Sequence, residues 1–123
     1  MITATSDKRR SAQHSIYKAM ALVGIVQHDY PGNESLFMAS ARLHAASDAL
    51  RGRYALSADQ KVSLLNRAVL KLSQSLASAA HASQAISGDA EAAQLIDYAR
   101  DAMLAATFSV NAVLAMGELT EDN

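Results

Sequence analysis

The stretch Asp89–Met116, DAEAAQLIDYARDAMLAATFSVNAVLAM, decides the fold of this chain. Its apolar residues recur at alternating steps of three and four, and this spacing places them in one stripe along a helix. The stripe consists of Ile96, Ala99, Met103, Ala106, Val110 and Val113. From Ala102 onward the opposite side is apolar too, because this half contains no charged residue. Such a helix lies either at the centre of a bundle or against a partner.

A second apolar stripe runs along the other side of this helix and consists of Leu104, Phe108, Ala112 and Ala115. Leu22 and Ile25 form a weaker second stripe on the first predicted helix. Two alternatives stay open at this point. Either the bundle buries all of these side chains, or they form an exposed patch that accepts a partner helix or a second subunit.

The same rhythm predicts three further helices. The first covers residues 11–28, and the second covers residues 34–50 after a turn that contains Pro31. The third begins at the capping box of Ser57 and Gln60. The expected core stripes of these helices are Ala12, Ile16, Ala19, Val23 and Val26; Leu36, Ala39, Leu43, Ala46 and Leu50; and Val62, Leu65, Val69, Leu72, Leu76, Ala79 and Ile86.

Four helices joined by short loops pack as antiparallel neighbours, so the predicted fold is an all-α, antiparallel up-down four-helix bundle. Residues 1–10 are assigned to a basic N-terminal lead-in, in which Ser6 or Asp7 caps the first helix. Residues 11–117 form the single helical-bundle domain, and residues 118–123 form an acidic tail. The third and fourth helices are expected to be longer than the first two.

Composition excludes several classes of function. A net charge of −1 gives no electrostatic footprint for nucleic acid. No run of apolar residues is long enough to span a membrane. The 123 residues include no cysteine, which removes disulfides and thiolate chemistry and fits a reducing compartment. We therefore expect a cytoplasmic protein with neither a nucleic acid nor a membrane as its partner.

No constellation of residues predicts chemistry. The four histidines, His14, His28, His44 and His81, show no His-x-x-x-His or Glu-x-x-His spacing, so no metal site is predicted. Asp97 and Asp101 lie one turn apart with Arg100 between them, an arrangement that local ion pairing explains. No glycine-rich phosphate loop and no nucleophile elbow occurs. We expect no catalytic residue and no cofactor.

Two segments resemble the FliS-type flagellin export chaperones. One is Leu65-Asn-Arg-Ala-Val-Leu-Lys-Leu72, which is similar to the leucine–x–basic–alanine helix of that family. The other is Asp97-Tyr98 followed by Met103-Leu104-Ala105-Ala106. The resemblance implies a small cytoplasmic antiparallel helical bundle that shields the C-terminal helices of flagellin until export. It also places Tyr98, Leu104 and Phe108 in the matching helix.

The predicted function is non-enzymatic binding of a helix of a partner protein, with a secretion chaperone as its most concrete form. The alternative is a self-associating homodimeric bundle, a broad class that includes small immunity and inhibitor proteins. In both cases the predicted partner-binding residues are the apolar residues outside the core stripes, together with the tyrosine of the resemblance: Leu22, Ile25, Tyr98, Leu104, Phe108, Ala112 and Ala115.

Overall fold

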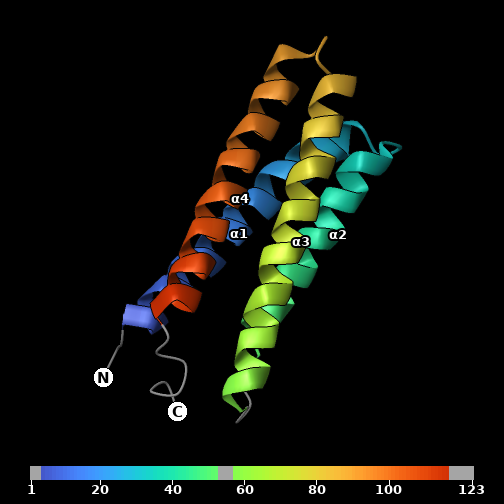
Figure 1. Ribbon diagram of the computed structural model, residues 1–123. Helices are drawn as coiled ribbons and strands as arrows, with labels where there is room; N and C mark the ends of the chain where they lie inside the picture. The colour runs from blue at the N-terminus through green and yellow to red at the C-terminus, as the bar shows by residue number, and fades with distance from the viewer. Residues whose placement is uncertain (1–3, 53–56, 117–123) are drawn as a thin grey trace.

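The computed structural model describes residues 4–52 and 57–116, which form four α-helices and the turns next to them (Figure 1). The helices are α1 (Ala4–Asp29), α2 (Glu34–Leu50), α3 (Ala58–Ala85) and α4 (Ala90–Met116). Consecutive helices pack against each other, and α1 also packs against α4. The start of α1 and the end of α4 lie at the same end of the molecule (Figure 1). The predicted all-α, up-down four-helix bundle is confirmed.

The core consists of the stripes that the spacing predicts. All six residues of the α4 stripe and all five of the α1 stripe are buried. In α2 and α3 most stripe residues are buried as well, while Leu50, Val62, Val69 and Leu76 pack against the core from its edge. Several core residues are alanines, whose small side chains let neighbouring helices approach closely.

The first helix begins earlier than the sequence predicts. It starts at Ala4 instead of Ser11, so Ser6 and Asp7 lie in its first turns and do not cap it. Nothing in residues 4–10 breaks a helix, and the carboxylate of Asp7 is favourable near the positive end of the helix dipole. As a result α1, with 26 residues, is nearly as long as α4 with 27, and only α2 is short, with 17.

The starts of the other three helices are capped by side chains. The Asn33 carboxamide oxygen accepts from the Leu36 amide at 3.0 Å. At Ser57 both bonds of the capping box are present, 3.2 Å to the Gln60 amide and 3.0 Å from the Ser57 amide. These caps satisfy amides that have no partner within the helix. Gly117, the last residue of the predicted domain, and the acidic tail lie outside the described residues.

The second half of α3, residues 73–85, is rich in serine and alanine and packs directly against α2. Ser75 is fully buried, and its hydroxyl donates to the carbonyl oxygen of Ala39 at 2.8 Å. Ala79 and Ala82 on the same side are also fully buried. This half of α3 therefore belongs to a closely packed helix pair.

Candidate functional site

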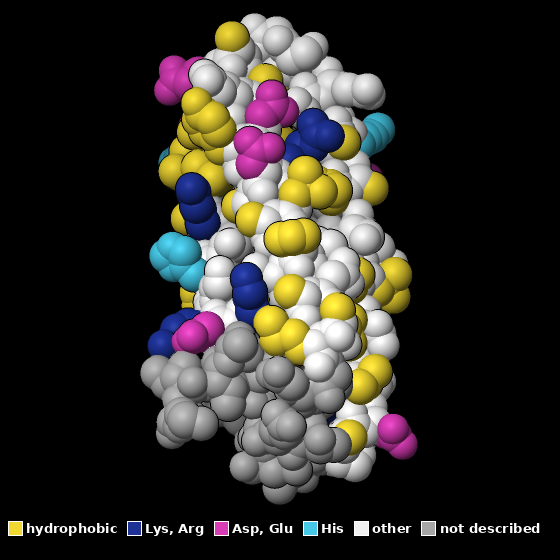
Figure 2. Space-filling model, turned by 60° about the vertical axis from the view of Figure 1, so that its left-hand side comes forward, with side chains coloured by type: hydrophobic (Ala, Val, Ile, Leu, Met, Phe, Trp, Pro, Cys, Tyr) yellow, Lys and Arg dark blue, Asp and Glu magenta, His cyan; other side chains and the backbone are white. Residues whose placement is uncertain are grey.

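Large apolar side chains remain exposed on α1 and α4. The exposed fraction is 54% for Ile25, 49% for Tyr98, 52% for Leu104 and 75% for Phe108. Ala115 is exposed, while Leu22 and Ala112 are half-buried. The bundle therefore does not bury the second stripes. On the side of the bundle where α4 lies, hydrophobic side chains form separate groups with charged side chains between them (Figure 2).

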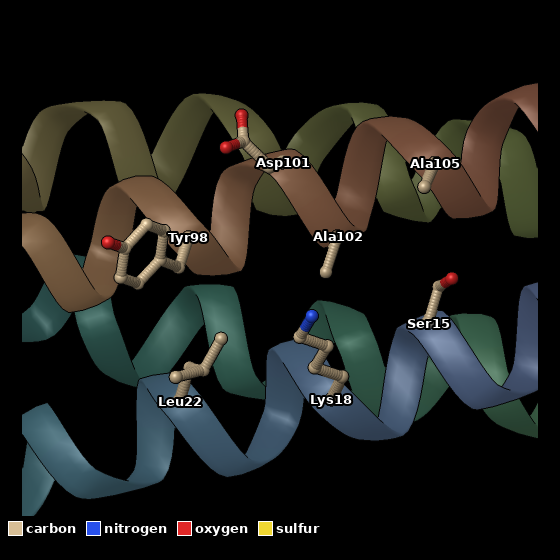
Figure 3. Close-up of a pocket in the computed structure, with 7 residues that line it drawn as sticks. All are labelled: Ser15, Lys18, Leu22, Tyr98, Asp101, Ala102 and Ala105. Atoms are coloured by element: carbon tan, nitrogen blue, oxygen red, sulfur yellow. The ribbon is translucent and has the colours of Figure 1, made fainter.

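A hollow of about 410 Å³ lies between α1 and α4, and we call it the α1/α4 groove. It is lined by Ser15, Lys18 and Leu22 from α1 and by Tyr98, Asp101, Ala102 and Ala105 from α4. Figure 3 shows the two walls facing each other, with the amino group of Lys18 directed towards α4 and the carboxylate of Asp101 directed away from α1.

The two halves of the α1/α4 groove differ in the size of their side chains. Leu22 and Tyr98 face each other in one half, whereas Ser15 and Ala105 lie in the other (Figure 3). The charged side chains of Lys18 and Asp101 lie between these halves. Neither forms an ion pair or hydrogen bond with another described residue. The groove thus has a bulky half and a small half, with Lys18 directed across it between the two and the Asp101 carboxylate directed away from α1.

A smaller hollow of about 150 Å³ continues between the same helices, beside the bulky half. We call it the acidic end, because Asp29, Asp89 and Glu91 line it together with apolar residues. Its α1 wall includes Ile25, which lies one turn beyond Leu22. The two hollows follow each other along the contact between α1 and α4.

A hydrogen bond between two turns borders the acidic end. The Tyr30 hydroxyl donates to a carboxylate oxygen of Asp89 at 2.7 Å, which links the α1–α2 turn to the α3–α4 turn. This bond lowers the pKa of Asp89, and the amide of Ala92, which Asp89 caps, lowers it further. The same bond is the main reason that the pKa of Tyr30 is raised. Both shifts favour the ionised carboxylate with the neutral phenol beside it.

The structure separates the predicted partner-binding residues into two groups. Leu22, Ile25 and Tyr98 come together along the α1/α4 groove and its acidic end. The second stripe of α4, formed by Leu104, Phe108, Ala112 and Ala115, does not line either hollow. The two hollows therefore include three of the seven predicted residues.

Sequence reasoning missed other exposed or groove-lining residues. Tyr17, Phe37, Met38 and Leu70 are large hydrophobic residues that the bundle leaves exposed. The position of Phe37, directly beside the core residue Leu36, already turns it about 100° away from the core. The groove residues Ser15, Lys18, Asp101, Ala102 and Ala105 gave no comparable pattern, because they are small or charged.

The histidines and the acidic pair of α4 lie on the surface of the described part of the bundle. Among residues 4–52 and 57–116, no three His, Asp or Glu side chains come close enough to hold a metal ion. All four histidines are exposed. The expected ion pair between Asp97 and Arg100 is present at 3.5 Å, on the surface of α4. No helix in the described part of the chain is long and apolar enough to cross a membrane.

Comparison with known proteins gives no match to a family model, a curated protein or a solved structure.

Proposed function

We propose that this chain is a non-enzymatic protein-binding module, which packs helical segments of another protein chain into its α1/α4 groove. The observation that carries the proposal is the combination of a 410 Å³ hollow with large apolar side chains exposed beside it. Exposed apolar surface around a groove is typical of sites that accept an amphipathic helix. The charged side chains of Lys18 and Asp101 would favour one of the two orientations in which such a helix can lie along the groove.

A secretion chaperone is the most concrete form of this function, and it rests on the resemblance to FliS-type proteins. The small antiparallel bundle fits that form. So does the position of Tyr98, the tyrosine of the resembling segment, on the wall of the groove. In this form the protein would shield an apolar helix of an export substrate from water and from other chains. The predicted compartment is the cytoplasm, and a sequence without cysteine fits such a reducing compartment.

Photo-crosslinking tests the proposal. Benzoylphenylalanine is placed at Tyr98, in the cells that naturally express the chain, and the adducts are identified by mass spectrometry. The matched control carries the same group at Leu70, which is similarly exposed, at 53%, but lies on α3 outside the groove. We expect a discrete protein adduct from position 98 and none of that mass from position 70.

The identity of the adduct separates the forms of the function. A secreted filament subunit would support the chaperone, and an adduct of twice the mass of the chain would support self-association. No adduct from position 98, or identical adducts from both positions, would contradict protein binding in the groove.

A further inference from the structure

The acidic end of the α1/α4 groove combines an apolar floor with carboxylates that lack a cation. Its lining includes two large apolar and three acidic side chains, which are Ile25, Leu95, Asp29, Asp89 and Glu91. None of the three carboxylates forms an ion pair with a described residue. Like charges around one hollow repel each other, and a cationic ligand relieves this repulsion.

A basic side chain of a partner suits the acidic end better than a metal ion does. In the part of the chain that the structure describes, no three acidic or histidine side chains lie close enough to hold a metal ion. Lysine and arginine have long apolar stems, which can pack on Ile25 and Leu95 while the charged head reaches the carboxylates. The acidic end therefore favours a lysine or an arginine of the partner.

Lys18 gives the neighbouring part of the α1/α4 groove the opposite charge. Its amino group points across the groove towards α4 (Figure 3), and it has no ion partner among the described residues. Lys18 and Asp29 are eleven residues apart, so they share one side of α1 and lie about 16 Å apart along it. The floor of the groove therefore changes from basic to acidic over three helical turns.

The walls of the groove favour a helix over an extended segment. Both walls are helices, whose backbone amides and carbonyls are already bonded within α1 and α4. An extended segment would find no backbone partner there, whereas a helix satisfies its own backbone groups. A helix can also pack nearly parallel to two antiparallel neighbours. Its large side chains fit the half that contains Ser15 and Ala105, where the groove leaves them room.

We infer that the occupant of the α1/α4 groove is an amphipathic helix of another protein, with a basic and an acidic residue about eleven positions apart on one face. The basic residue lies at the acidic end, and the acidic residue lies beside Lys18. Apolar residues four and seven positions from the basic one pack on Ile25 with Leu95 and on Leu22 with Tyr98. The inference rests on the proposed protein-binding function and adds the chemistry of the partner.

Two synthetic peptides and the purified full chain test this charge pattern. Both peptides are helices of alanine and glutamine with lysine at position 3 and leucine at positions 7, 10 and 17. Position 14 is glutamate in the first peptide and lysine in the second. Fluorescence anisotropy at low salt measures their binding. We expect the wild-type chain to bind the lysine–glutamate peptide roughly fivefold more tightly, because the second peptide places a lysine beside Lys18.

Reversal of the groove charge should reverse the preference. Lys18→Glu is expected to bind the lysine–lysine peptide roughly fivefold more tightly than the lysine–glutamate peptide. The matched control is Arg67→Glu, which makes the same change of net charge at an exposed position on α3 outside the groove and should keep the wild-type preference. Circular dichroism verifies folding. If Lys18→Glu does not fold, Lys18→Gln replaces it and should bind both peptides about equally.

The inference is overturned if the wild-type chain binds neither peptide or binds both equally, or if the charge of position 18 does not change the preference. The crosslink from position 98 separates these failures from that of the proposed function. A different protein whose crosslinked helix lacks the charge pattern overturns the inference alone, and so does a second copy of this chain. The absence of any adduct overturns the proposed function as well.

Discussion

Met103 and Leu104 are neighbours in the sequence, yet the bundle treats them in opposite ways. Met103 is fully buried in the core, whereas the side chain of Leu104 is 52% exposed. Both are flexible apolar residues of similar size, so residue type does not explain the difference. An α-helix turns by about 100° per residue, so Met103 points towards the other helices and Leu104 points away from them. The inner stripe of α4 belongs to the core, and large outer residues such as Leu104 remain exposed.

Truncation of Met103 gives the largest expected effect on stability. Truncation of Leu104, its neighbour, tests the comparison directly. We expect Met103→Ala to lower the free energy of unfolding by about 2–5 kcal/mol, because it leaves a cavity in the buried core. Leu104→Ala should cost less than about 1 kcal/mol, since solvent already reaches that side chain. Urea unfolding of both variants provides the measurement. Equal losses would contradict the division of α4 into an inner and an outer stripe.

The serines of α3 extend the same comparison to polar side chains. Ser75 is buried and donates to the carbonyl of Ala39, while Ser73 on the same helix is exposed. We expect Ser75→Ala to cost about 0.5–1.5 kcal/mol, the usual net value of one hydrogen bond. Ser73→Ala should be neutral or slightly stabilising, because alanine favours helix more than serine does. Urea unfolding again measures both, and a neutral Ser75→Ala would show that the α2–α3 contact depends on packing alone.

Much of the fold follows from sequence periodicity, and much of the groove does not. Residues of a core stripe such as Ile96 and Met103 belong to one helix, so their shared side can be worked out locally. The α1/α4 groove depends on how Ser15 and Ala105 are placed across two helices that are distant in sequence. Small and charged residues carry no hydrophobic pattern that would point to this placement. The early start of α1 was missed for the same reason, since residues 4–10 are mostly polar.

The splitting of the predicted site also has a geometric cause. Tyr98 and Leu104 are six residues apart, which places them about 120° apart around α4. Tyr98 therefore faces α1, whereas Leu104 and Phe108 lie outside the groove lining. A list of apolar residues outside the core stripe contains Tyr98 as well as Leu104 and Phe108. Such a list does not show that Tyr98 lies on a different side of α4 from the other two.

The contact between Tyr30 and Asp89 predicts a smaller, pH-dependent effect at the surface. Because the pKa of Asp89 is lowered from its ordinary 3.8, the stabilisation is present above that value and is lost as the pH falls through the lowered pKa. The pKa of Tyr30 is raised from 10.0, so the stabilisation is present below that value and is lost as the pH rises through the raised pKa.

Tyr30→Phe removes this contact and leaves the ring in place. We expect the variant to be less stable than the wild type at neutral pH, with a difference that shrinks below about pH 4 and above about pH 10. Chemical unfolding of both proteins across pH measures it. A difference that stays constant across this range would show that the hydroxyl contributes through something other than its bond to Asp89.

The concentration dependence of thermal unfolding tests most directly whether the outer residues of α1 and α4 serve association. If a second copy covers the groove, unfolding is coupled to dissociation, and the wild-type midpoint rises with protein concentration. The double variant Leu22→Ser, Tyr98→Ser should lose this dependence and remain helical, whereas Phe108→Ser, outside the groove, should keep it. A wild-type midpoint that is the same at all protein concentrations would contradict self-association through the groove and leave a different protein as its occupant.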